Sequence, residues 1–239
     1  MLLTEKTMPR YFLLLIICAF LLQDLPAQML NQTDDRGRKQ GKWQKTSVIG
    51  SLRYEGQFRD NRPYGTFRYY YRSGELQTEN LFSDDGIVAE SKMYYRDGSL
   101  FAEGTYVNQQ KDGIWLYYSE PDGKLIAREQ YKDGKMHGEN LTYYAETGEI
   151  LEVINYEEGT KNGPYKKYFP DGQLMTEGNY KDDQLNGMFI SYYPNGEVQV
   201  RGTYRMGLQT GNWEYFDESG GILTREDFLM DQGDSIREK

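Results

Sequence analysis

Cysteine is almost missing from this sequence, which contains only Cys18, and histidine occurs once, as His137. A chain with a single thiol cannot close an internal disulfide, and it has no set of thiolates for a zinc site. One imidazole leaves no second histidine for a metal centre, and a serine triad would need His137 although no nucleophile-elbow motif is present. The composition therefore predicts no catalytic residue, no metal site and no cofactor.

Long hydrophobic runs are also lacking, and the longest is the twelve-residue stretch 11–22. Twelve apolar residues are too few to span a bilayer as a helix, which takes about twenty. The run follows Arg10 and precedes Ala27, so it has the basic start, short apolar core and small-residue cleavage site of a secretory signal. A buried helix or an uncleaved anchor is the alternative. A lipid anchor at Cys18 is rejected because Ile17 stands where a small residue is needed. We expect cleavage after Ala27 and export to the periplasm, the outer envelope or the extracellular space.

Positive charge is in short supply, since 28 lysines and arginines face 37 acidic residues, which gives a net charge of −9. Nucleic-acid binding depends on lysine and arginine to neutralise phosphates, and docking on anionic lipid needs basic clusters. The balance therefore disfavours nucleic acid and anionic membranes as partners. It favours a protein partner with basic patches.

Glycine and tyrosine are abundant instead, and they recur with a period of 24 or 25 residues. The period is set by glycines that each precede an aromatic or polar residue by two positions, with Ala89 in place of one glycine. The start positions are Gly41, Gly65, Ala89, Gly113, Gly138, Gly163, Gly187 and Gly211. This spacing gives seven full units and a partial eighth, which is typical of a repeat array stabilised by contacts between neighbours.

Each unit reads as strand, tight turn, strand and looser turn. The tight turns carry Asp-Gly or Asn-Gly pairs such as Asp97-Gly98 and Asn195-Gly196, which suit two-residue hairpin turns with positive φ at both positions. We predict an all-β fold, a single elongated twisted sheet of antiparallel β-hairpins, without a substantial helix after the leader. The missing glycine at Ala89, next to Ser83–Gly86, predicts a bulge or kink there.

Alternation along the strands assigns two faces to this sheet. One face is a ladder of rings lying over glycines, and Leu100 is placed on it with Ala102 and Gly104. The ladder rings, expected to form the core, are Trp43, Phe67, Trp115, Tyr165, Phe189 and Trp213. The opposite face carries glutamates such as Glu79, Glu103 and Glu177. The predicted binding residues lie among them: Tyr70, Tyr94, Tyr143, Tyr168 and Tyr192.

The segments Tyr131–Gly138 and Tyr180–Gly187, each followed by an aromatic pair, resemble the MORN repeat. They are more similar still to the bacterial MORN variant of YwqK-type proteins, which are often labelled antitoxins. The resemblance covers about residues 41 to 230 and implies a β-hairpin array. It brings no catalytic residue.

The sequence is thereby divided into a signal peptide at 1–27, a short linker at 28–40, MORN-like repeats at 41–232 and a polar tail at 233–239. We expect a non-enzymatic protein–protein interaction or scaffold module of the cell envelope. A carbohydrate or cell-wall binding module is the alternative, because tyrosine-rich surfaces also stack on sugars. An antitoxin-like inhibitor and an enzyme are less favoured readings.

Overall fold

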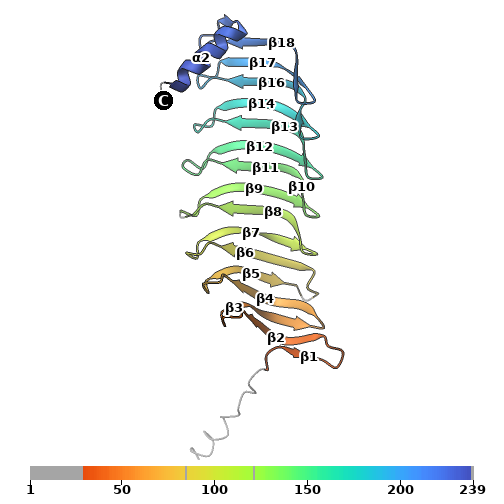
Figure 1. The fold of residues 1–239 in the computed structure, drawn as a ribbon. Helices are drawn as coiled ribbons and strands as arrows, with labels where there is room; N and C mark the ends of the chain where they lie inside the picture. The colour runs from red at the N-terminus through yellow and green to blue at the C-terminus, as the bar shows by residue number, and fades with distance from the viewer. Residues whose placement is uncertain (1–28, 84, 121, 238–239) are drawn as a thin grey trace, which may run out of the picture.

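The computed structural model describes residues 29–83, 85–120 and 122–237, with side chains placed as far as Asp231. The predicted signal peptide at 1–27 lies outside these residues. The described chain forms one open antiparallel sheet and one helix, so the predicted all-β hairpin array is confirmed (Figure 1).

Among the described residues the sheet contains 19 strands. They are β1 (Gln32–Thr33), β2 (Lys39–Thr46), β3 (Leu52–Arg59), β4 (Arg62–Tyr70), β5 (Leu76–Phe82), β6 (Val88–Tyr94), β7 (Leu100–Val107), β8 (Gln110–Tyr118), β9 (Leu125–Lys132), β10 (Lys135–Met136), β11 (Gly138–Tyr143), β12 (Ile150–Glu157), β13 (Thr160–Tyr168), β14 (Leu174–Lys181), β15 (Gln184–Leu185), β16 (Gly187–Tyr192), β17 (Val198–Arg205), β18 (Leu208–Phe216) and β19 (Ile222–Leu223). The helix is α2 (Arg225–Arg237).

Successive strands pair antiparallel, except that β10 and β11 together form one row that pairs with β9, and β15 and β16 form one row that pairs with β14. The strands are stacked like rungs along the long axis of the molecule (Figure 1). One edge of the stack carries longer turns such as Tyr71–Glu75, called here the long-turn edge. The opposite edge carries two-residue turns such as Asp60-Asn61, called here the short-turn edge.

The two kinds of turn are the reverse of what the sequence predicts. At the predicted hairpin turns, such as Asp97-Gly98 and Asn195-Gly196, only the glycine has positive φ, and the chain closes through bonds such as Tyr95 N–H to the Ser99 carbonyl. Asp97 instead accepts the Ser99 N–H at 2.9 Å, which fixes the turn through its side chain. Both central residues have positive φ on the short-turn edge, for example Asn108 and Gln109. Those are the two-residue hairpins.

The start glycines produce β-bulges. Gly65 and Gly113 have φ of 64° and 73°, and the pairings β3–β4 and β7–β8 shift register beside them. The pairing β5–β6 keeps one register from Thr78 to Phe82. The predicted bulge is therefore wrong, because an alanine disfavours the positive φ that a glycine bulge requires. The junction is irregular in its turn instead, since the connection from Phe82 to Val88 is longer than the two-residue turns of that edge.

A second shift recurs next to the long turns and corrects the position of one leucine. Met93 pairs with Ala102, but Tyr94 pairs with Leu100. Residues directly opposite each other share a face of the sheet. Leu100 thus lies on the face of Tyr94 and not with Ala102, because the extra residue Phe101 interrupts the alternation.

The ladder is the core of the array, and its rings rest on glycines as predicted. A Cβ added to Gly56, Gly104 or Gly202 would lie 2.3–2.4 Å from ring atoms of Phe67, Trp115 or Trp213. Phe67 and Trp115 are 2% and 0% exposed although no second sheet covers them among the described residues. Neighbouring side chains cover them instead: Phe58 and Phe82 meet Phe67 edge to face at 5.1 and 5.2 Å between ring centres, and the Lys111 Nζ lies 4.6 Å from the Trp115 ring centre.

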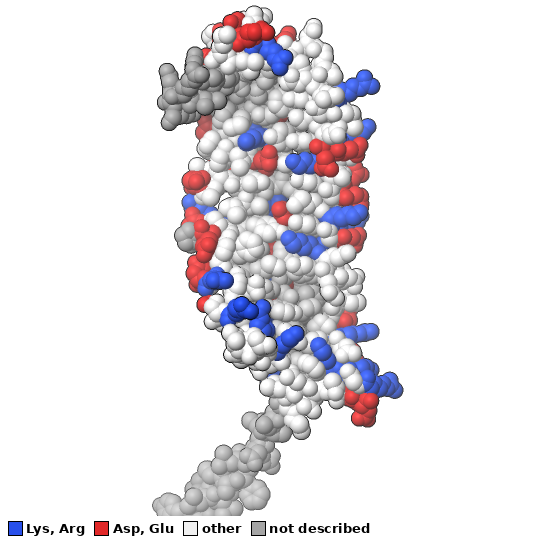
Figure 2. All heavy atoms as spheres, viewed as in Figure 1, with Lys and Arg blue, Asp and Glu red and all other residues white. Residues whose placement is uncertain are grey.

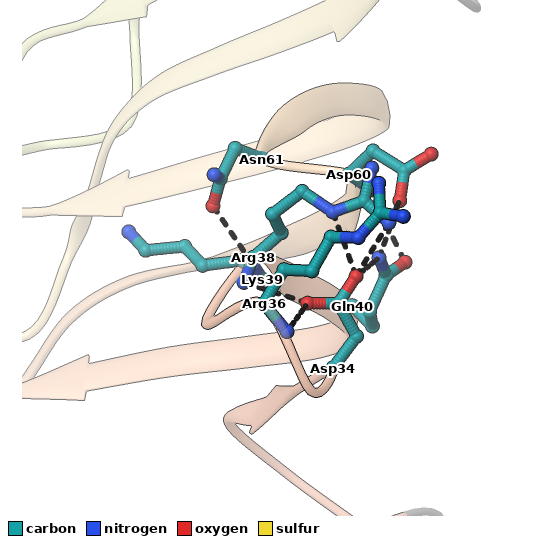
Figure 3. Close-up of polar contacts among 7 residues, drawn as sticks. All are labelled: Asp34, Arg36, Arg38, Lys39, Gln40, Asp60 and Asn61. Carbon is teal, nitrogen blue, oxygen red and sulfur yellow. Dashed lines mark hydrogen bonds and ion pairs between the residues drawn. The ribbon is translucent and has the colours of Figure 1, made fainter.

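Short elements cap both ends of the sheet. At the N-terminal end Asp34 accepts hydrogen bonds from the Arg36 and Arg38 N–H groups and from the Arg38 side chain, which also pairs with Asp60 (Figure 3). The bonds to Arg38 lower the pKa of Asp34 to about 2. Strand β1 and the start of β2 thus occupy part of the segment expected to be a linker.

At the C-terminal end, β19 gives way to α2, so the prediction of no substantial helix is corrected. Thr224 caps the helix by accepting the Asp227 N–H at 3.1 Å, and Phe228 lies 5.1 Å from Tyr215 of β18. The partial eighth unit therefore ends in a helix that runs across the expected boundary at 232.

Candidate binding surface

The five predicted binding tyrosines occupy one repeat position, at the end of β4, β6, β11, β13 and β16. The registers place Tyr70 opposite Leu76, Tyr94 opposite Leu100 and Tyr192 opposite Val198. All five, Tyr70, Tyr94, Tyr143, Tyr168 and Tyr192, are half-buried. They lie on the face opposite the ladder, called here the glutamate face, because Tyr70 reaches Glu55 there.

Two of these tyrosines use their hydroxyl groups inside the array. Tyr70 donates to Glu55 at 2.6 Å, and Tyr192 donates to Glu177 at 2.7 Å. Desolvation and the glutamate bond raise the pKa of each phenol to about 12. These bonds join one unit to the next, so both residues belong to the fold as well as to the surface.

The other three hydroxyls have no such partner among the described side chains. The residue fifteen positions earlier is Glu79 for Tyr94, Arg128 for Tyr143 and Val153 for Tyr168. Glu79 accepts from Arg68 at 2.8 Å instead, and neither an arginine nor a valine can accept a phenol proton. Tyr94, Tyr143 and Tyr168 therefore keep polar tips available to a ligand on a half-buried ring.

Sequence reasoning missed Tyr118, which is the member of this set in the fourth unit, the one that starts at Gly113. Tyr118 pairs with Leu125 and donates to Glu103 at 2.7 Å. Desolvation and this bond raise the pKa of Tyr118 to about 12. Taking Tyr117-Tyr118 as the aromatic pair of that unit shifts the pair one residue toward the N-terminus. Tyr118 then counts as the second member of the pair and is left out of the set. Counting five residues forward from the start position of the unit, as from Gly65 to Tyr70, leads from Gly113 to Tyr118 and would have found it.

In four units the second aromatic of the pair is a tyrosine with a structural role that the sequence did not reveal. Its hydroxyl donates to the main-chain carbonyl of the first aromatic in the next unit, 23 or 24 residues on. The bonds are Tyr71 to Tyr94, Tyr95 to Tyr118, Tyr144 to Tyr168 and Tyr193 to Phe216, at 2.8–3.0 Å. These tyrosines link neighbouring units along the long-turn edge.

The ladder is interrupted by a polar cluster beside Trp115. Lys111 donates to the Tyr117 hydroxyl, and Tyr131 donates to Glu129 at 2.7 Å. Burial lowers the pKa of Lys111, and burial with bonds to Glu129 and Tyr131 raises that of Tyr117. Every group has a partner, and the cluster covers the Trp115 ring, so it serves the core.

No constellation for catalysis emerges in the described part of the chain. No group of three His, Cys, Asp or Glu residues there could hold a metal ion. The His137 N–H donates to the Gln130 carbonyl, as a turn residue does. No described helix has the length and apolar character needed to cross a membrane.

Charge gathers along the two long edges of the face in view, whose centre is mostly uncharged (Figure 2). The long-turn edge is acidic from the fourth long turn onward. Its carboxylates there are Glu120, Asp122, Glu146, Glu149, Asp171, Glu197, Asp217 and Glu218, against the single base Lys124.

The comparison with protein families agrees with this architecture. The family model described as MORN repeat variant matches residues 63–84, 88–108, 161–182 and 185–206. Each match starts one or two residues before a start position of the period and covers one long-turn hairpin. No curated protein matches the chain. The four matches, together with the hairpin array, show that this chain contains MORN repeats of the variant type.

Proposed function

We propose that this protein is an exported, non-enzymatic protein–protein interaction or scaffold module of the cell envelope. The observation that supports it most directly is the open single-layer sheet. No second layer of described residues covers either face, so one rigid surface runs along the whole array. Repeat arrays with extended surfaces of this kind commonly bind other macromolecules.

The partner we propose is a protein with basic patches. The acidic long-turn edge supplies a row of eight carboxylates against one lysine, which steers a basic surface toward it. Tyr94, Tyr143 and Tyr168 on the glutamate face add half-buried rings with available hydroxyls. Tyrosine offers large rigid contact area at low entropic cost.

The ladder favours a protein partner over a glycan. Sugars stack on open ring faces, but Phe67 and Trp115 are 2% and 0% exposed and lie against glycines. The ladder rings also meet edge to face, as Tyr106 does with Trp115 at 70°. The ladder rings are therefore packed against the sheet and offer no open face on which a sugar could stack.

The test is affinity capture from an envelope extract of the native host, with the chain from residue 28 onward as bait and a glycan array run in parallel. We expect a specific protein, captured less by the variant Tyr94→Ala/Tyr143→Ala/Tyr168→Ala. The control variant Met206→Ala/Leu208→Ala removes exposed apolar groups on the short-turn edge and should capture it normally. Binding to glycans alone would replace this function with the carbohydrate alternative.

Export is tested separately by the intact mass of the protein from its native host. Loss of residues 1–27 from an envelope or secreted fraction is expected. A full-length product confined to the cytoplasm would contradict the proposal.

A further inference from the structure

The first three long turns carry a positive patch in an otherwise acidic molecule. Arg53, Arg72 and Arg96 line one hollow of about 490 Å³, together with Ser47, Tyr71 and Gln77. All three arginines are exposed. Lysines and arginines gather at the lower end of the left edge in Figure 2, and mostly acidic residues lie above them.

These arginines are not neutralised by the fold. Six ion pairs join described residues, and none involves Arg53, Arg72 or Arg96. The acids in the same turns are engaged elsewhere. Asp97 accepts from the backbone and side chain of Ser99. Ser73 and the local backbone are the main causes that hold the pKa of Glu75 below its usual range, with a smaller contribution from Arg96.

The hollow is also held in shape. The Arg96 guanidinium lies 5.4 Å from the centre of the Tyr71 ring, and the Tyr71 hydroxyl donates to the Tyr94 carbonyl at 2.8 Å. A stacked guanidinium keeps its donor edges turned outward, ready for a two-point bond to a carboxylate. The repeat supplies this charge only here. The residue that corresponds to Arg72 and Arg96 in later units is Glu120, Ala145, Pro170, Pro194 or Glu218.

We propose that this arginine hollow, made by Arg53, Arg72 and Arg96, binds the carboxylates of an acidic protein segment. The proposal rests on the proposed function, protein–protein interaction, and adds a second contact of opposite charge to the acidic edge. Charge complementarity makes the occupant anionic. Its length follows from the strand spacing: Arg72 follows β4 and Arg96 follows β6, two strands apart, or about 10 Å. A run of carboxylates can reach both of these separated arginines at once, whereas one compact phosphate cannot.

The probe is a fluorescent hexaglutamate peptide, titrated with the chain from residue 28 onward and followed by anisotropy. The site variant is Arg53→Gln/Arg72→Gln/Arg96→Gln. The matched control is Lys132→Gln/Lys181→Gln/Arg205→Gln, which removes the same charge from exposed positions on the short-turn edge. We expect the site variant to bind at least about tenfold more weakly, the worth of one good charged contact. The control should stay within about twofold.

Three outcomes overturn the proposal: no binding by the unmodified chain, equal losses in both variants, or displacement by inorganic phosphate at the same concentration as by peptide. A charge reversal guards against misfolding, since Arg72→Glu/Arg96→Glu should gain binding to a hexalysine peptide. Envelope capture that is unaffected by the site variant would leave the proposed function standing and remove only the hollow.

Discussion

At the scale of single residues, the ladder is built from complementary pairs. A ring in one strand lies over a glycine in the strand before it, as Trp115 lies over Gly104. Where Asn80 faces Ser91 across β5 and β6, the larger residue, Asn80, takes the glycine position and the smaller residue, Ser91, takes the ring position. The same inversion recurs where Glu129 takes the glycine position and Asn140 the ring position. Close packing favours one small residue in such a facing pair, as Ser91 is beside Asn80, although Tyr165 faces Ile154 in the pairing of β12 with β13.

The pairing predicts that alanine destabilises the protein much more at one glycine of the ladder than at another, equivalent one. Gly104→Ala should lower the free energy of unfolding by about 1–3 kcal/mol, because its Cβ would lie 2.4 Å from the Trp115 ring. Gly178→Ala should cost little, since the nearest atom of Phe189 is 3.4 Å away. Urea unfolding measures both.

The double variant Gly104→Ala/Trp115→Ala sharpens this test. Trp115→Ala alone should cost about 3–5 kcal/mol as a buried ring. With the ring gone, the added cost of the Gly104→Ala substitution should vanish, which is a nonadditive result. Equal effects of Gly104→Ala in both backgrounds would show that the ring does not press on the glycine.

The tyrosine–glutamate bonds predict a loss of stability in alkali. Tyr70, Tyr118 and Tyr192 have a pKa of about 12, above the ordinary value of 10. Between these values the folded protein holds protons that the unfolded chain has released. Their contribution is therefore complete below pH 10 and lost as the pH rises toward 12. Phenolate absorbance and urea midpoints at pH 9 to 12 measure it.

Glu177→Gln is the matched variant for this prediction. It should bring the pKa of Tyr192 back toward its ordinary value and remove one part of the alkaline loss. Tyr168→Phe serves as the control, because Val153 stands where the glutamate would be, and it should leave the pH profile unchanged. An unchanged number of late-titrating phenols in Glu177→Gln, with Tyr192 still among them, would contradict the assignment.

At the scale of elements, one repeat unit is a hairpin that contacts its neighbours only. Each unit is joined to the next by the strand ladder, by tyrosine bonds such as Tyr144 to Tyr168, and by turn bonds such as Asp183 N–H to the Lys161 carbonyl. All three links have the period of the repeat. Removing one complete period therefore restores the same contacts between new neighbours.

Deleting Gly163–Asn186 should leave a shorter folded protein, since Gly187 takes the place of Gly163 after Asn162. Deleting only residues 163–173 should disrupt folding, because β14 would lose its partner β13. Circular dichroism and thermal melts distinguish the two. An unfolded product from the whole-unit deletion would show that stability depends on contacts beyond neighbours.

At the scale of the whole molecule, the array is long because it is a single sheet. About fifteen full strands at about 4.8 Å give a length on the order of 70 Å. A compact domain of similar size would have a radius of gyration of roughly 17 Å. Small-angle scattering of the chain from residue 28 onward should give a clearly larger radius and an elongated distance distribution. A compact profile would mean that the sheet folds back on itself.

The sequence by itself determined the period, the all-β class, the ring-over-glycine ladder and the side on which Tyr70 lies. These follow from local spacing and from strand alternation, which a single chain records directly. The tertiary structure decided which turns are two-residue turns, where the bulges fall and which tyrosine hydroxyls are engaged. A bulge adds one residue and reverses the alternation, so Leu100 was assigned to the wrong face. The helix α2 was missed because its sequence carries little amphipathic pattern. The arginine hollow depends on residues from successive long turns meeting at one edge, and only the stacking of units brings them together.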